Sequence, residues 1–584
     1  MNIIGLSDVN DLHHDNSAAL IQDGNLVFAA SEERFTRRKH DPSFPLNALK
    51  ACLDHADLGL DDIDYFAVGW PKTSFYPYLF TRKAGDVPKA VFSLLKADPL
   101  AFVRHSIWSL GDKILNRQLQ NELDRLGVDP SRVEYVSHHQ AHAASAYRLS
   151  GYQDCLTVVV DTFGPDRDGQ LVSGGIYICH DGAIDRLVEI PAYTSVGSFY
   201  TGVTVALGFT FGDGEGKTMG LAAYGDPDAC YAEMCEIAPR FEDGEWKASP
   251  GWLDLALALN RDLFLATPTG RVLQRMVECY SDRDVAASAQ RVLEELLVSY
   301  VQHYWERTSQ SRLALAGGVF LNIKANGRIL SSLSMDDVFI HPHAGDGGTA
   351  VGAALELHYE KTKQWTPTRM ESAALGREYL GEEIEQALAE FAEEIVYERV
   401  ENVSRVTAEK VAEGKVIGWF QGRPEWGPRA LGSRSVVADP RNEATKERIN
   451  DQMKRRDWFM PFAPSTLVEQ AADYFVGCLS SPFMLLGFDV ADGKAEHIPA
   501  VIHVDKTARP QTVSGEVNPL YYDMIHHFYE LTGIPLVLNT SFNRHGLPIV
   551  ETPQDAIEHL TWGCVDELAI GPFVARRRDE GPSG

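Results

Sequence analysis

Two stretches far apart in the chain share one order of strands and turns. Residues 3–35 read as a strand, a polar loop and a hairpin with an Asp-Gly turn at residues 23–24. Residues 156–190 repeat that order, with a second Asp-Gly turn at residues 181–182. An Asp-Gly pair between apolar runs is a strong signal of a β-hairpin. We therefore predict duplicated α/β lobes that face a cleft, against the alternative of two unrelated β-meanders.

The size and composition of the chain narrow its class. A length of 584 residues exceeds one ordinary core and predicts two or more domains. Residues 1–5 begin a strand rather than a signal peptide, and no apolar run reaches the length of a membrane span, so we expect no membrane partner. The net charge of −28 argues against a nucleic-acid partner. The eight cysteines form no CxxC pair, which indicates reduced thiols and a cytoplasmic location.

A histidine pair is the strongest indication of a metal site in the sequence. The segment HHQAHAASA, residues 138–146, follows a strand-like run and should be helical. Residues four apart share one helix face, so His138 and His142 can point at one metal ion. A zincin protease needs a glutamate beside the first histidine, and this segment has none. A pair of surface histidines is the alternative.

Two aspartates are placed to complete such a site. Asp161 ends the apolar strand TVVVD, where open α/β sheets bind ligands. Asp346 lies among glycines in HPHAGDGG, ahead of a helix of small residues. Two histidines with carboxylates suit Fe, Zn or Mn. An ordinary turn is the alternative for each aspartate taken alone.

Nucleotide-binding folds of the actin and sugar-kinase type are built from such duplicated lobes, and several polar stretches lie where these folds approach a phosphate. The glycine-rich residues 211–225 predict a loop whose backbone N–H groups approach phosphate, although they match neither Walker A nor GxGxxG. Residues 313–329 predict a strand, a Gly-Gly turn and a helix that starts near Asn322. His14 lies in the first polar loop, and Lys39 belongs to a cationic run. Solvated surface charge is the ordinary alternative.

The last third of the chain is rich in arginine. A linker is expected around residues 360–375, followed by a separate α/β unit. Guanidinium groups in turn-rich, apolar surroundings predict an oxyanion site, because Arg binds phosphate with two N–H groups. Surface salt bridges are the alternative. The candidate side chains are Arg423, Arg429, Arg434, Lys454, Arg455, Arg456, Arg509, Asn539, Ser541 and Asn543.

Taken together, these motifs resemble the NodU/CmcH family of O-carbamoyltransferases. The most specific matches are HHQAHAASA, GDGEGKTMGLAAYG, GWFQGRPEWGPRALGSRS, MPFAPS and LNTSFN, in that order. The resemblance implies an α/β protein with two domains. Residues 1–365 would form a duplicated actin-like (ASKHA) domain, similar to the metal-dependent enzymes that make threonylcarbamoyl-adenosine on tRNA. Residues 366–584 would form a domain similar to the YrdC fold.

The resemblance also implies substrates and roles. Carbamoyl phosphate would be broken down in the C-terminal domain, and ATP would activate the carbamate for a small-molecule hydroxyl acceptor. A divalent metal, with Fe the first candidate and Zn or Mn the alternatives, would be held by His138, His142, Asp161 and Asp346. Mg-ATP would be held by Gly212, Asp213, Gly214, Lys217, Gly317, Gly318 and Asn322. Carbamoyl phosphate would be held by Arg423, Arg429, Lys454, Arg455, Arg509, Ser541 and Asn543. His14 would act near the reacting groups, and Lys39 would offset phosphate charge.

One position departs from the family pattern. Many relatives carry arginine immediately before the PFAP tetrapeptide, but this chain has Met460 there. Arg455 or Arg456 would replace that charge, or the donor site is rearranged. Two other functions stay open, a tRNA threonylcarbamoyl-transferring fusion and a non-catalytic nucleotide-binding regulator. A homodimer is left open as the assembly.

Overall fold

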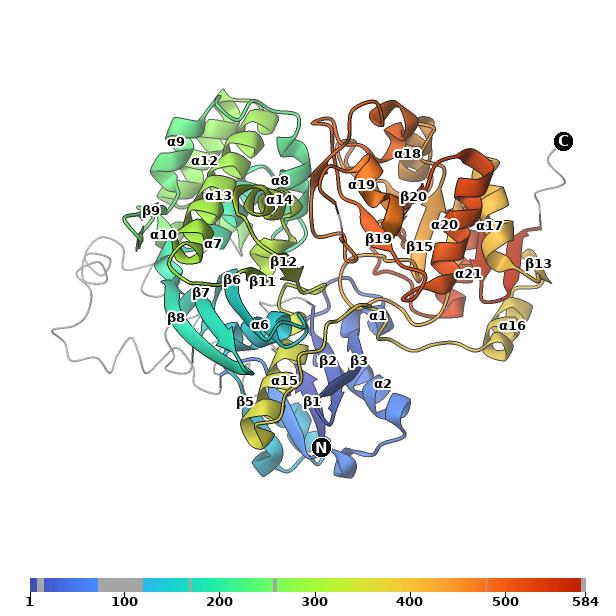
Figure 1. The fold of residues 1–584 in the computed structure, drawn as a ribbon, viewed down its shortest axis with the longest axis horizontal. Helices are drawn as coiled ribbons and strands as arrows, with labels where there is room; N and C mark the ends of the chain where they lie inside the picture. The colour runs from blue at the N-terminus through green and yellow to red at the C-terminus, as the bar shows by residue number, and fades with distance from the viewer. Residues whose placement is uncertain (8–14, 72–118, 167–170, 256–259, 479, 579–584) are drawn as a thin grey trace.

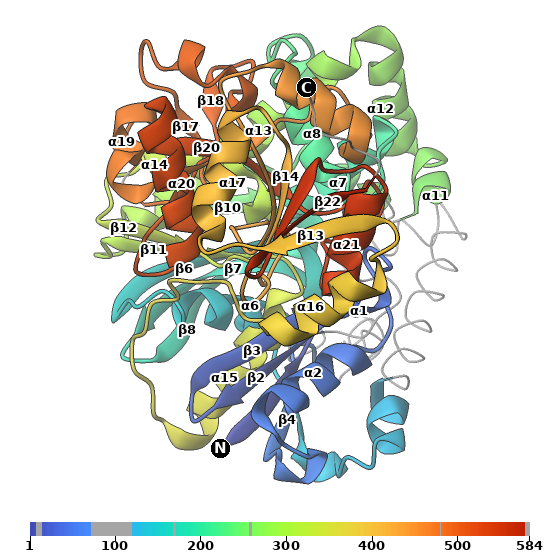
Figure 2. The same ribbon diagram turned by 90° about the vertical axis from the view of Figure 1, so that its right-hand side faces the viewer.

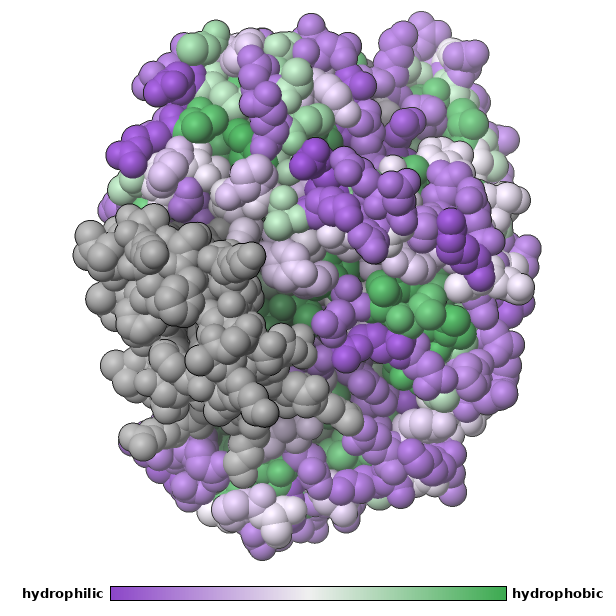
Figure 3. Space-filling view, turned by 90° about the vertical axis from the view of Figure 1, so that its left-hand side faces the viewer, coloured by the Kyte–Doolittle hydropathy of each residue, from purple (hydrophilic) through white to green (hydrophobic). Residues whose placement is uncertain are grey.

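The computed structural model describes residues 1–7, 15–71, 119–166, 171–255, 260–478 and 480–578. It shows two N-terminal lobes and a C-terminal α/β part packed against both (Figure 1). His14 lies outside the described residues, so its predicted role stays a prediction. In the described residues, no helix is long and apolar enough to cross a membrane. Hydrophilic side chains predominate among the coloured atoms on the face in Figure 3, in line with the strongly charged composition.

The first lobe is built on a five-stranded sheet of order β3-β2-β1-β4-β5. β1 pairs antiparallel with β2 and parallel with β4. Helix α2 (Leu46–Ala56) packs on β2 and β3. The strands are β1 (Asn2–Leu6), β2 (Ser17–Gln22), β3 (Asn25–Ser31), β4 (Tyr65–Val68) and β5 (Val133–Tyr135).

The second lobe repeats this arrangement in the order β8-β7-β6-β11-β12. Its central strand again has an antiparallel hairpin on one side and parallel strands on the other. Both predicted hairpin turns are confirmed, since Asp23 and Asp181 have φ near 49° and 48° and the following glycines φ 82°. The predicted duplication of an α/β lobe is therefore confirmed. The strands are β6 (Asp154–Pro165), β7 (Leu171–His180), β8 (Ala183–Pro191), β11 (Arg312–Ala316) and β12 (Asp337–Ile340).

Two helices of small residues fill the space between the lobes (Figure 1). Helix α6 (His138–Tyr147) packs on β6 and β11, and α15 (Gly348–Thr362) packs on β1 and β2. A Cβ on Gly352 would lie 1.8 Å from the carbonyl oxygen of Ala141, so only glycine permits this approach of the two helices. The close contact fixes α6, and with it the histidine pair, at the junction of the lobes.

Two local expectations need correction. β6 does not end at Asp161 but continues to Pro165, and its pairing with β7 is broken between Val160 and Gly164. The irregular stretch turns Asp161 away from the regular ladder. The expected loop at residues 211–225 contains helix α8 (Glu215–Ala222), which packs against α13 (Asp282–Trp305).

A mostly helical insertion follows β8. Phe199 and Phe264 are buried in its own core. Its elements are α7 (Val196–Ala206), α9 (Tyr231–Ile237), β9 (Arg240–Glu242), β10 (Glu245–Lys247), α10 (Trp252–Leu255), α11 (Arg261–Leu265) and α12 (Pro268–Cys279). Helix α14 (Ile323–Ser332) follows β11.

The C-terminal part is built on an eight-stranded sheet of order β13-β22-β21-β14-β15-β20-β16-β19 (Figure 2). The strands are β13 (Ile395–Arg399), β14 (Ile417–Phe420), β15 (Arg434–Ala438), β16 (Ala463–Leu467), β19 (Gln511–Val513), β20 (Leu536–Ser541), β21 (Glu567–Ile570) and β22 (Phe573–Arg577). The helices are α16 (Gly381–Glu390), α17 (Val403–Ala412), α18 (Ala444–Ile449), α19 (Ala471–Tyr474), α20 (Pro519–Thr532) and α21 (Pro553–Thr561). Thr552 caps α21. The likeness to YrdC and the boundary at residue 365 stay predictions.

The first lobe is tied to the C-terminal part through helix α1 (Glu32–Thr36). Arg34 donates to the carbonyl oxygen of Gly427 at 2.9 Å. Arg37, at the end of α1, donates to the carbonyl oxygen of Ile549 at 2.7 Å and pairs with Asp555 of α21 at 3.2 Å. Figures 1 and 2 both show α1 beside the C-terminal part. These bonds hold the first lobe and the C-terminal part together.

Candidate functional site

Two histidines and two aspartates meet where α6, β6 and the turn before α15 come together. The Nε2 atom of His142 lies 3.3 Å from Asp161 Oδ2 and 3.4 Å from Asp346 Oδ1. The Nε2 atom of His138 lies 3.4 and 3.6 Å from the same two oxygens. All four candidate ligand atoms lie within 4.8 Å of one another. The structure thus brings together the four residues that the sequence predicts as metal ligands.

The surroundings of this group fit a divalent cation. Both histidines are fully buried. Neither ring nitrogen of His142 has a hydrogen-bond partner among the described residues. Burial by itself would lower the pKa of His142, but Asp161 and Asp346 raise it to about 9. A bound cation would replace the proton that this environment stabilises, and imidazole with carboxylate suits Fe, Zn or Mn.

A glycine turn of the second lobe lies beside the metal-ligand group. Gly317 has a φ of 100°, and a Cβ there would lie 2.2 Å from the carbonyl oxygen of Val160. The adjacent Gly318 lies so close to Asp161 that its Cβ would be 3.1 Å from Oδ1 of that carboxylate. Asn322 caps α14 and exchanges two hydrogen bonds with Gln290. The turn therefore presents bare backbone next to the ligand group, as a phosphate-binding turn requires.

One cavity of about 420 Å³ connects this group with the C-terminal part. Asp161 and Asp346 line it on the N-terminal side, and Arg429 and Asn543 line it on the C-terminal side. Of the other predicted site residues, it is also lined by Lys39, Gly212, Asp213, Gly318, Asn322 and Ser541. Residues predicted for the metal, the nucleotide and the donor thus face one continuous space.

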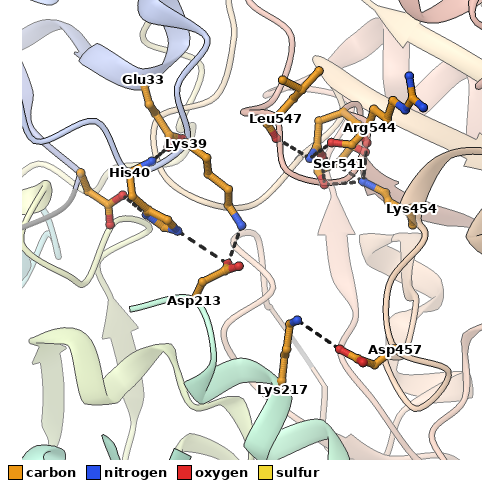
Figure 4. A network of polar contacts seen from close by, with 12 residues as sticks. Glu33, Lys39, His40, Asp213, Lys217, Lys454, Asp457, Ser541, Arg544 and Leu547 are labelled. Atoms are coloured by element: carbon orange, nitrogen blue, oxygen red, sulfur yellow. Dashed lines mark hydrogen bonds and ion pairs between the residues drawn. The ribbon is translucent and has the colours of Figure 1, made fainter. Parts of the chain in front are cut away.

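A polar cluster from the first two lobes lies at this cavity (Figure 4). Lys39 forms an ion pair with Asp213. The ring of His40 lies 3.0 Å from Asp15 through Nδ1 and 3.6 Å from Asp213 through Nε2. Burial would lower the pKa of His40, but the two aspartates raise it to about 10. His40 is therefore a cation of this cavity that our sequence reasoning missed, although it directly follows Lys39.

The residues of the predicted nucleotide loop have different surroundings, since some line the cavity and one contacts the C-terminal part. Gly212 and Asp213 line the cavity, whereas Gly214 packs against the carbonyl oxygen of Thr210 and does not. Lys217, in the first turn of α8, places its Nζ 3.1 Å from Oδ2 of Asp457 (Figure 4). This ion pair joins the second lobe to the C-terminal part.

Four cations form a group on the C-terminal side of the cavity: Arg429, Lys454, Arg456 and Arg509. None of the four forms an ion pair with a carboxylate of the described residues. Lys454 donates to Ser541 Oγ at 2.8 Å and to Asn543 Oδ1 at 3.0 Å. Burial lowers the pKa of Arg429 to about 10. Burial and the neighbouring Arg429 and Arg456 hold the pKa of Arg509 well below its usual range. Lys454 is buried and the three arginines are partly buried, and such cations without counter-charges are typical of an anion-binding site.

Two predicted donor residues lie elsewhere. Arg423 donates to the carbonyl oxygens of Val27, Leu375 and Gly376, so its guanidinium links the first lobe to the C-terminal part. Arg455 is exposed and has a left-handed backbone, with φ 40°. The next residue, Arg456, joins the cation group instead. The sequence shows no sign of this backbone reversal, so it cannot tell which of the two adjacent arginines belongs to the cation group.

The sequence of this chain matches two family models over most of its length. Residues 2–355 match the family model described as Carbamoyltransferase N-terminus, and residues 408–577 match Carbamoyltransferase C-terminus. The chain belongs to the carbamoyltransferase family. It is 35% identical to nodulation protein NolNO of Sinorhizobium fredii over 98% of this chain and 80% of that protein. It is 37% identical to nodulation protein NolO of Bradyrhizobium diazoefficiens over 76% of this chain and 79% of that protein.

One solved structure shows a weak likeness to this carbamoyltransferase. HypF of T. kodakarensis matches with a TM-score of 0.32 and 14% identity, covering 62% of this chain and 48% of that chain. The family assignment therefore rests on the sequence matches, which span both halves of the chain.

Proposed function

We propose that this carbamoyltransferase transfers the carbamoyl group of carbamoyl phosphate, with ATP, to a hydroxyl group of a small-molecule natural product. The observation that carries the proposal is one cavity lined by Arg429 of the cation group and by Asp161 and Asp346 of the histidine–aspartate group. The first group suits a phosphate-bearing donor, and the second suits a cation that accompanies nucleotide phosphates.

The C-terminal cations would hold the donor. Carbamoyl phosphate and water give carbamate and phosphate, and the phosphate product is a monoanion or dianion near neutral pH. Among the described residues, Arg429 and Arg509 have no carboxylate partner, and the buried Nε of each lacks a hydrogen-bond partner, so N–H groups remain available for the phosphate oxygens. Lys454 is fixed by Ser541 and Asn543, which positions one ammonium at the end of β20. Each charge-assisted hydrogen bond contributes roughly 1.5–3 kcal/mol.

The N-terminal lobes would carry out the transfer. A carbamate oxygen attacks the α-phosphorus of ATP, and pyrophosphate leaves. The acceptor hydroxyl then attacks the carbonyl carbon of the carbamoyladenylate, giving the carbamate ester, AMP and a proton. Lys39 and His40 supply positive charge near Asp213, and the turn at Gly317–Gly318 supplies backbone N–H groups. A divalent cation held by His138, His142, Asp161 and Asp346 would neutralise phosphate charge.

Enclosure matters because both intermediates react with water. Carbamate decomposes in solution, and a mixed anhydride with phosphate is readily hydrolysed. The cavity that Arg429, Asp161 and Asp346 line would let carbamate move without leaving the protein. The ties through Arg34, Arg37 and Arg423 hold the halves together around it.

The direct test follows pyrophosphate release. Purified protein with ATP should release pyrophosphate only when carbamoyl phosphate is also present. His142→Ala should lower the bound metal measured by inductively coupled plasma mass spectrometry and abolish pyrophosphate release, while phosphate release from carbamoyl phosphate persists. His139→Gln, which alters a buried histidine outside the ligand group, is the control and should retain the metal. Equal pyrophosphate release with and without carbamoyl phosphate would reject the proposed function.

A further inference from the structure

The segment that follows Lys454 reverses direction at a single residue. Residues 450–454 form a short wide helical turn, and Arg455 ends it with a left-handed φ of 40°. The reversal leaves Arg455 exposed and turns Arg456 inward. Lys454 and Arg456 therefore lie on the interior side, although an arginine separates them in the sequence.

The Arg456 guanidinium is held in place by neutral groups. Its Nε donates to Asn450 Oδ1 at 3.3 Å, and one terminal nitrogen donates to the carbonyl oxygen of Pro461 at 3.3 Å. Its central carbon lies 4.2 Å from the centre of the Phe462 ring. These contacts orient the fork of N–H groups and leave its charge unneutralised.

Arg456 lies close enough to two other guanidiniums for their charges to interact. Burial and the charge of Arg429 lower the pKa of Arg456 to about 10. Arg456 in turn contributes to the lowered pKa values of Arg509 and Lys454. Four cations that repel one another in a buried group are stabilised by a shared anion of high charge density, such as a phosphate dianion.

Met460 contributes to a different contact. Its sulfur lies 3.4 Å from where a Cβ on Gly220 would be, so the side chain faces helix α8 of the second lobe. It packs with the small apolar cluster that contains Leu221, Ala222 and Phe459. Position 460 thus joins the two halves of the molecule and adds no charge to the cation group.

We propose that Arg456 binds the phosphate group of the donor, as the fourth cation beside Arg429, Lys454 and Arg509. The inference rests on the proposed function, because it assigns the residue to the carbamoyl phosphate site. Arg455, its exposed neighbour, takes no part in that site.

The test compares two adjacent arginines. For Arg456→Gln, we expect the KM for carbamoyl phosphate in the phosphate-release assay to rise by about ten- to a hundredfold, the range for one lost charge-assisted hydrogen bond. The KM for ATP should stay within about twofold of the wild-type value, because the change is local to the donor group. Arg456→Lys should recover part of the loss, since it restores the charge but not the fork. Arg455→Gln is the matched control and should behave as wild type.

Thermal melts with and without inorganic phosphate provide a readout that does not need turnover. Phosphate should raise the Tm of the wild type and of Arg455→Gln more than that of Arg456→Gln. An Arg456→Gln protein with wild-type KM and a wild-type phosphate shift would overturn the inference. A lower kcat and Tm with unchanged KM would also overturn it, because that pattern indicates a purely structural role. Failure of the wild type to release phosphate from carbamoyl phosphate would instead reject the proposed function.

Discussion

The ion pair between Lys217 and Asp457 gives the sharpest prediction about how the two halves cooperate. It joins the first turn of α8 to the segment that carries Lys454 and Arg456, at 3.1 Å. The Lys217 and Asp457 side chains are 24% and 37% exposed, so solvent screens the pair and it contributes only about 0.2–1 kcal/mol. The segment that carries Lys454 and Arg456 is docked when it contacts α8 and undocked when it does not. A loss of about 1 kcal/mol lowers the ratio of docked to undocked protein about fivefold.

Asp457→Asn should therefore uncouple the half-reactions without unfolding the protein. We expect phosphate release from carbamoyl phosphate to continue at close to the wild-type rate. The ratio of pyrophosphate to phosphate released should fall by up to about fivefold, because less carbamate is retained near the nucleotide.

Both products are measured in one reaction by separate coupled assays. Glu409→Gln, which breaks the exposed pair of Arg405 and Glu409 on α17, is the control and should leave the ratio unchanged. An unchanged ratio in Asp457→Asn would refute the reasoning, as would a loss of stability well above about 1 kcal/mol.

Three further changes test other parts of the structure. Arg423→Gln removes hydrogen bonds to three carbonyl oxygens, so the free energy of unfolding in urea should fall by about 1–3 kcal/mol with an unchanged KM for carbamoyl phosphate. A raised KM for carbamoyl phosphate would contradict this and indicate that Arg423 binds the donor. His40 has a pKa of about 10 in the folded protein and about 6.5 when unfolded, so its charge stabilises the fold fully below about pH 6 and this contribution is lost as pH rises through 10. The stability difference between wild type and His40→Gln should therefore narrow from pH 6 to about pH 10, and a widening difference would contradict this. Gly317→Ala places a Cβ 2.2 Å from a carbonyl oxygen and should destabilise by more than about 1 kcal/mol, whereas Gly216→Ala, which meets no atom within 4 Å, should be neutral or stabilising by up to about 1 kcal/mol. Equal effects of the two substitutions on urea unfolding would contradict this.

Features that depend on local patterns could be predicted from the sequence. The Asp-Gly turns at residues 23–24 and 181–182 have the left-handed backbone that their hairpins require, and they marked the duplicated lobes. His138 and His142 are one helical turn apart, so their common direction follows from helix geometry alone. Asp161 is expected from the end of the apolar run TVVVD and Asp346 from the glycines around it, although β6 itself continues to Pro165.

Features that depend on a single dihedral angle or a distant contact could not. The left-handed backbone of Arg455 decides that Arg456 faces the cation group, and no residue type nearby announces it. Arg423 carries the same charge as Arg429, but three backbone carbonyls far apart in the sequence hold its guanidinium. Packing against α13 makes a helix of residues that a glycine-rich pattern presents as a loop.

The most direct test of the shared cavity follows one carbon atom. Protein is mixed with carbamoyl phosphate labelled with carbon-13, ATP and an excess of unlabelled bicarbonate and ammonium, which supply unlabelled carbamate in solution. The reaction is quenched, and carbamoyladenylate is analysed by mass spectrometry. If carbamate passes through the cavity that links Arg429 to Asp346, the adenylate keeps the full label of the donor. Dilution of the label toward that of the bicarbonate would contradict internal transfer.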